Sequence, residues 1–307
     1  MQRSRTSLVS LAAGLLLATT VGCGKKAVDP VQLIPEGAIA IGGVEVATLM
    51  AAPLFVENKD ALLEGAEVNE FMVALKACKL DPSKDAKLLI AIADKDRAIV
   101  TIKSKGIGVE ANMKCMLEKI PPDEGKAKLA ETAGRKSLVL GDGDGVCFLA
   151  SADVLACASK GWTDDLVAIL DGKGKSAAVG SLKTPLANAD QSKPLWFSAQ
   201  MTGALAEETK GSPLEKATSV SGSLDFTNGM GVVVNMGLAT PEAAAELSKM
   251  LNDQLGQVLP LAPMVGVPKP VADSVKVAAV GSSVEATAAA TFEELKAISE
   301  QLKKMAK

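Results

Sequence analysis

The chain has 307 residues and a formal net charge of −3, with no His, no Tyr and only 3 % aromatic residues. The absence of His excludes Ser-His-Asp and Cys-His nucleophilic sites, His-ligated zinc and ordinary haem ligation. The acidic balance argues against a nucleic-acid partner, because such a partner needs a basic face that releases counterions.

The N-terminus has the layout of a secretory signal. A short basic region, MQRSRTS, precedes an apolar run over residues 8–21, and Lys25 and Lys26 follow soon after it. The run is shorter than the about 20 apolar residues that a transmembrane helix needs. We therefore expect residues 1–22 to be a cleaved signal peptide. Its removal takes away Arg3 and Arg5 and lowers the net charge from −3 to −5.

The end of this signal resembles the lipobox of bacterial lipoproteins in Thr20, Val21, Gly22 and Cys23. The chain departs from the family pattern at Thr20, where Leu is usual. The resemblance implies that the Cys23 thiol carries diacylglycerol, becomes the new N-terminus and, with two or three acyl chains, anchors the protein stably to a membrane. Gly24 in place of Asp implies the outer membrane. The alternative is an ordinary secretory peptide in which Cys23 is incidental.

We expect a lipid-anchored tether at residues 23–35, followed by two α+β domains at 36–190 and 191–307. In the first domain, apolar periodicity predicts one strand, then a helix, a hairpin, a second helix and a second hairpin. Their predicted bounds are 38–44, 68–78, 87–93 with 98–103, 109–120, and 137–140 with 146–150. A further strand is expected at 154–158, and a connecting segment at 175–193.

The same order recurs after residue 195. A strand and a short helix precede a hairpin whose Asn228-Gly229 turn is a strong hairpin signal. A helix then begins at Thr240-Pro241, a hairpin follows, and Thr291 with Glu294 forms a capping box for a C-terminal helix. The predicted strands are 195–200, 220–226, 230–236, 275–280 and 284–288. The fold class is therefore α+β, in two related halves, each an antiparallel hairpin sheet covered by helices. Coincidence of common elements is the alternative to duplication.

Four cysteines remain after Cys23: Cys78, Cys115, Cys147 and Cys157. An even number in an exported chain predicts two disulfides out of three possible connectivities. A four-thiolate metal site is the alternative, but no close C-x2-C or C-x4-C spacing occurs. Cys78 and Cys115 lie at the edges of helical apolar faces, and a tight turn at 151–153 would place Cys147 opposite Cys157. We therefore predict Cys78–Cys115 and Cys147–Cys157.

Two incomplete motifs are better explained as loops. Residues 172–176, GKGKS, end like a phosphate-binding loop, but Ile169 stands where that motif needs Gly. Asp142 and Asp144 begin like a calcium loop, but Val146 and Cys147 follow where an oxygen ligand and Gly are required. Residues 258–270 are apolar and proline-rich without periodicity, which leaves a packed loop or an exposed partner-binding patch open.

These observations predict a non-catalytic, surface-tethered binding or scaffold protein of the bacterial envelope. We expect no catalytic residue, no cofactor, no metal and no nucleic-acid partner. The expected partners are the membrane, through lipid on Cys23, and an envelope protein. A carrier of apolar or lipid-like ligands is the second hypothesis, and a hydrolase without His is the third.

Overall fold

A computed structural model describes residues 28–62, 73–94, 96–119, 127–141, 143 and 145–305. The predicted signal peptide, Cys23, Asp142, Asp144 and residues 68–72 of the predicted 68–78 helix lie outside the described residues. Of that helix, residues 73–77 are described and are helical.

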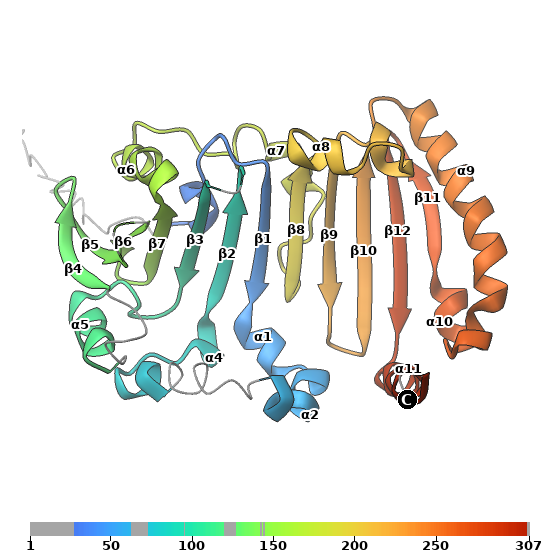
Figure 1. Cartoon of the computed structure of the whole chain (residues 1–307), viewed down its shortest axis with the longest axis horizontal. Helices are drawn as coiled ribbons and strands as arrows, with labels where there is room; N and C mark the ends of the chain where they lie inside the picture. The colour runs from blue at the N-terminus through green and yellow to red at the C-terminus, as the bar shows by residue number, and fades with distance from the viewer. Residues whose placement is uncertain are drawn as a thin grey trace, which may run out of the picture.

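The core of the molecule is one continuous antiparallel sheet of 12 strands (Figure 1). The strand order is β11-β12-β10-β9-β8-β1-β2-β3-β7-β6-β5-β4. The strands are β1 (Ala40–Glu45), β2 (Lys87–Ile92), β3 (Ala98–Lys103), β4 (Lys128–Thr132), β5 (Arg135–Leu140), β6 (Gly145–Ser151), β7 (Val154–Ser159), β8 (Leu195–Gln200), β9 (Ser219–Asp225), β10 (Met230–Gly237), β11 (Lys276–Val280) and β12 (Ser283–Ala290).

Helices connect and cover these strands. The longer helices are α2 (Pro53–Leu62), α5 (Glu110–Lys119), α6 (Thr163–Leu170), α9 (Pro241–Val258) and α11 (Phe292–Met305). The shorter ones are α1 (Val46–Ala51), α4 (Pro82–Asp85), α7 (Lys183–Ala187), α8 (Ala204–Glu208), α10 (Lys269–Ser274) and the 3-10 helices η1 (Pro30–Leu33), η2 (Lys160–Trp162), η3 (Pro213–Lys216) and η4 (Leu259–Val265). The α+β class and the antiparallel hairpins are confirmed.

The two predicted halves share this sheet. Strand β8, which opens the second half, pairs directly with β1, which opens the first. We expected a separate sheet in each half. The structure instead has a single sheet, because the backbone groups of β1 and β8 hydrogen-bond to each other and neither strand is left as an edge. The internal repeat and the domain boundary near residue 190 stay predictions. Strand β4 was not predicted.

The sheet has two faces, which we name by the side chains that alternate along the strands. Face A carries Ile41, Leu89 and Ile99, and face B carries Gly42, Ile90 and Val100. On face A, the half formed by β1, β2, β3, β7 and β6 is covered by η1, α6 and α7, whose side chains join one buried cluster with Trp162 and Trp196. On face B, α5 covers β5–β7 and α9 covers β10–β12.

The segment expected to be a polar tether is partly core. Asp29 caps η1 by accepting a hydrogen bond from the Val31 N–H at 3.1 Å. Leu33 and Ile34 then lie in the face A cluster with exposed fractions of 4 % and 1 %. The free tether can therefore reach only to about residue 28, because burial of these aliphatic side chains stabilises the segment against the sheet.

Candidate functional site

Face B carries an apolar trough across the middle of the sheet. Cross-strand register places three rows of side chains on β2, β1, β8 and β9, and none of them is polar. The rows are Leu88, Val44, Leu195 and Leu224; Ile90, Gly42, Phe197 and Gly222; and Ile92, Ala40, Ala199 and Val220. Such a charge-free surface is typical of a buried sheet face, but Ile90 is 46 % exposed and Ile92 is 40 % exposed.

Two glycines give the trough its depth. A Cβ atom on Gly222 would lie 2.7 Å from the Phe197 ring, so the ring leans over Gly222. A Cβ atom on Gly42 would meet only the Trp196 carbonyl oxygen, at 3.5 Å. The space above Gly42 is therefore open, and the trough there has a volume of about 470 Å³.

Helices form the sides of the trough. On one side, Val234 and Met236 of β10, the strand after β9, pack against α9. On the other side, Ile102 of β3, the strand after β2, packs in the cluster that contains α5. No helix of the described residues packs over Gly42 and Phe197. The trough is therefore a recess in the helical layer of face B, open to solvent at Ile90 and Ile92.

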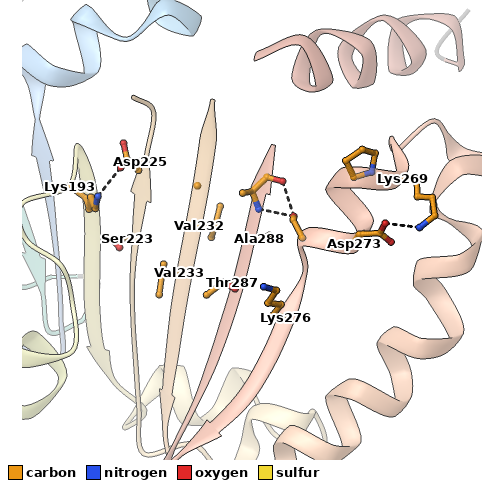
Figure 2. A pocket seen from close by; sticks show the side chains of 14 residues that line it. Lys193, Ser223, Asp225, Val232, Val233, Lys269, Asp273, Lys276, Thr287 and Ala288 are labelled. Atoms are coloured by element: carbon orange, nitrogen blue, oxygen red, sulfur yellow. Dashed lines mark hydrogen bonds and ion pairs between the residues drawn. The ribbon is translucent and has the colours of Figure 1, made fainter. Parts of the chain in front are cut away.

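A second hollow, which we name the polar groove, lies on face A over β9, β10 and β12 (Figure 2). Its volume is about 830 Å³. One row of its floor is Ser223, Val233, Thr287 and Lys276, neighbours in register across four strands. The next row has Gly231 between Asp225 and Ala289, and a Cβ atom on Gly231 would meet only the Asp225 Cβ, at 3.7 Å. Because Gly231 has no side chain, the floor of the polar groove is recessed at this position.

An ion pair fixes one wall of the polar groove. The Lys193 ammonium donates to Asp225 Oδ2 at 2.7 Å, and the other carboxylate oxygen accepts from the Thr227 N–H at 2.9 Å and hydroxyl at 2.6 Å. These bonds, the one from Lys193 first, lower the pKa of Asp225 to about 2 and raise the pKa of Lys193. Both groups stay ionised across the physiological range.

Helix α10 forms the opposite wall. The Ser274 hydroxyl accepts from the Ala289 N–H at 2.9 Å, which ties the end of α10 to β12. Lys269 and Asp273 pair at 2.6 Å on the exposed side of this helix (Figure 2). Lys276 makes no ion pair with any described residue. Three ammonium groups and two already paired carboxylates therefore surround the groove.

The disulfides lie away from both hollows. Cys78 bonds Cys115, with a Cα–Cα distance of 5.7 Å, and Cys147 bonds Cys157. This is the predicted pairing. All four side chains belong to the cluster under α5 on face B, so they link the helical layer and neighbouring strands in one core.

In the described part of the chain, the other segments that the sequence analysis considered do not form a binding or catalytic site. Residues 172–176 form a turn after α6, and Ser176 bridges to Pro35. No group of three or more potential metal ligands occurs among the described residues. Three side chains at the end of α9 and in η4 are exposed: Val258, Leu261 and Met264 recur at the three-residue spacing that aligns side chains along a 3-10 helix.

Within the described ranges, no helix has the length and apolarity needed to cross a membrane. Neither a protein-family model nor a curated protein matches the chain. The fold resembles that of TP0453.

Crystal form III of TP0453 matches with a TM-score of 0.55 and 8 % sequence identity, covering 89 % of this chain and 98 % of that one. Crystal form IV gives a TM-score of 0.54 with 8 % identity over 91 % and 99 % of the two chains. Crystal form I gives 0.51 with 11 % identity over 90 % and 99 %. At such identities the likeness shows that the two chains share a fold over nearly their whole length.

The sequence signals did not point to either hollow. The trough depends on the pairing of β1 with β8, whose partners Gly42 and Phe197 are 155 positions apart. The groove depends on the pairing of β10 with β12 and on the position of α10. One signal was present: Gly42-Gly43 interrupts an apolar strand, and a glycine within a strand often marks a close approach of another group.

Proposed function

We propose that this chain is an exported lipoprotein, held to an envelope membrane by acyl chains on Cys23, and that its body is a non-catalytic binding protein. The apolar trough of face B is its binding surface and takes an apolar segment of an envelope protein. One observation carries this proposal. A row-by-row apolar surface across four central strands is left open at Ile90 and Ile92, between two covered flanks.

Exposure of apolar side chains to water is unfavourable for this face. A Val, Leu, Ile or Phe side chain that passes from full exposure to full burial contributes about 1.5 to 3 kcal/mol, and Ile90 and Ile92, which are 46 % and 40 % exposed, would gain a corresponding part of this when covered. A protein without a partner for this face would pay that cost in solution. Large exposed apolar patches in soluble proteins mark binding surfaces.

The charged groups favour binding over catalysis. Each described carboxylate with a shifted pKa has its pKa lowered by hydrogen bonds or lysines: Asp81, Asp94, Glu110, Asp171, Asp190, Asp225 and Glu242. A general acid built from a carboxyl group needs the opposite shift. In a chain without His, this supports the binding hypothesis over the hydrolase hypothesis.

A carrier of apolar ligands is the second candidate. The volume of about 470 Å³ lies within the usual range of small-molecule sites. The trough is open rather than enclosed, which favours a protein segment over a small ligand that must be shielded from water.

The anchor is tested by Cys23→Ser. We expect wild-type chain in the membrane fraction with radiolabelled palmitate incorporated, and Cys23→Ser chain released and unlabelled. Retention of Cys23→Ser in the membrane fraction, or absence of label from the wild type, would refute the anchor.

The trough is tested by Gly42→Val, which fills it, against Gly231→Val, which fills the groove on the opposite face. Both proteins are purified from the native envelope, and bound proteins and lipids are identified by mass spectrometry. We expect a stoichiometric protein that is lost with Gly42→Val and kept with Gly231→Val. A lipid with that behaviour would establish the carrier instead, and no difference between the variants would exclude the trough as the site.

A further inference from the structure

The polar groove on face A is separate from the apolar trough, because the sheet lies between them. Its floor and walls come from β9, β10, β11, β12, α10 and the turn before β8. Its volume of about 830 Å³ is in the upper part of the range for small-molecule sites. Figure 2 shows Lys193 with Asp225 on one side, Lys269 with Asp273 on α10 on the other, and Val233 and Thr287 between them.

The charges around the groove favour a negative ligand. Both Asp225 oxygens already accept hydrogen bonds from Lys193 and Thr227. The Lys193 ammonium has three N–H donors and uses one of them on Asp225, so two are left. Lys276, at the end of the floor row, has no ion-pair partner among the described residues. The lining therefore carries one net positive charge in a chain whose net charge is −3.

The floor favours a ligand that also has an apolar part. Gly231, Val233 and Ala289 give a flat surface without charge, and the Ser223 and Thr287 hydroxyls flank Val233 in the same row. The walls are held in place before any ligand arrives, by the Lys193–Asp225 pair on one side and by the Ser274–Ala289 hydrogen bond on the other. Such preorganisation lowers the entropy cost of binding.

We propose that the polar groove is a binding site for a small organic anion, with its acidic group at the Lys193 ammonium on the β9 side and its apolar body on the floor over Gly231 and Val233, pointing toward Lys276 on β11. A charge-assisted hydrogen bond to the Lys193 ammonium provides selectivity for anions, and the unpaired charge of Lys276 at the far end of the floor adds a longer-range attraction. The site is independent of the trough on face B and of the membrane anchor.

The experiment uses the mature chain, residues 23–307, with Cys23→Ser, and 2-naphthoate as the probe. Calorimetry gives the affinity, and amide NMR shifts at Gly231, Thr287 and Ala289 give the place of binding. Acetate supplies the charge without the ring, and 2-naphthylmethylamine supplies the ring with the opposite charge. We expect each to bind at least about tenfold more weakly than 2-naphthoate.

The variants locate the site. We expect Gly231→Val to abolish binding of 2-naphthoate and Gly42→Val to leave it unchanged. Lys276→Gln, at an exposed position where the fold is not at risk, should weaken binding severalfold and reduce its dependence on salt, because it removes a longer-range attraction. Equal binding of the amine, or binding that survives Gly231→Val and Lys276→Gln, would overturn the proposal. Loss with Gly42→Val alone would also overturn it and would favour the trough.

Discussion

Two neighbouring glycines in β1 face opposite sides of the sheet and have opposite tolerance for a side chain. A Cβ atom on Gly43 would lie 2.2 Å from the buried ring of Trp196, whereas one on Gly42 would meet only a carbonyl oxygen, at 3.5 Å. Trp196 is 5 % exposed, so its ring has little room to move. Gly43 is therefore required by packing, and Gly42 only by the open space of the trough.

We predict that Gly43→Ala lowers the free energy of unfolding by about 1 to 3 kcal/mol, because it overpacks the contact with Trp196. Gly42→Ala is the matched control and should change it by less than about 1 kcal/mol. Urea denaturation of both variants measures the difference. Equal effects of the two substitutions would contradict the packing role of Gly43.

The Asp225 ion pair predicts a pH dependence of stability. The folded pKa of about 2 lies below the reference value of 3.8, so the carboxylate stabilises the fold fully above about pH 4 to 5, and this contribution is lost as the pH falls toward 2. Asp225→Asn should thus cost about 1 kcal/mol at pH 7, since the pair is one-third exposed, and much less at pH 2.5.

The comparison for Asp225→Asn is Asp273→Asn, which removes the more exposed pair with Lys269. We expect a change of less than about 0.5 kcal/mol at both pH values. Thermal unfolding from pH 2.5 to 7 follows both variants. A cost of Asp225→Asn that does not decrease on acidification would show that the pair contributes through packing and not through charge.

Among the secondary-structure elements, the local hairpins could be predicted because their strands and turns are adjacent in sequence. The Asn228-Gly229 turn and the alternation on either side of it specify β9 and β10, and Thr291 and Glu294 form the predicted capping box, with N–H to side-chain bonds of 2.7 and 3.2 Å. Pairing between distant strands could not be predicted, since apolar alternation fixes a strand's face but not its neighbour.

Burial of Leu33 and Ile34 was missed for a related reason. The surrounding sequence, with Lys25, Lys26 and Pro30, is typical of a polar tether, and only the face A cluster to which the two side chains bind explains their burial. Strand β4 was missed because its five residues include Lys128 and Glu131, as is common at a sheet edge, where charged side chains oppose pairing with another chain.

The two disulfides should differ in their contribution to stability. Cys78 and Cys115 are 37 residues apart, and Cys147 and Cys157 are 10 apart. Because a disulfide reduces the entropy of the unfolded chain more when it closes a longer loop, Cys78–Cys115 should stabilise the folded protein by about 1 kcal/mol more than Cys147–Cys157. We therefore expect Cys78→Ala with Cys115→Ala to cost more than Cys147→Ala with Cys157→Ala, measured by guanidinium denaturation under oxidising conditions. The reverse order would mean that local packing outweighs loop entropy.

At the scale of the whole molecule, the β1–β8 pairing joins the strands before residue 190 and those after it into one sheet. We predict that β2 and β9, on either side of this pairing, exchange their most protected amide hydrogens through the same global opening, with equal free energies. Native-state hydrogen exchange in low denaturant measures this. If β9 exchanged through an opening that leaves β2 protected, residues 191–307 would be a domain that unfolds independently, as the predicted boundary near residue 190 requires.

The packing of η1 on face A also bears on how an acylated chain would sit. Cys23 is five positions before Val28, which packs against the face A cluster, and a chain of that length spans at most about 17 Å. Lipid on Cys23 would thus be attached within that distance of Val28 on face A, whereas Gly42 and Phe197 lie on face B. If the proposed anchor is present, face A would therefore lie toward the bilayer, and the trough on face B would be the surface left open to the aqueous side.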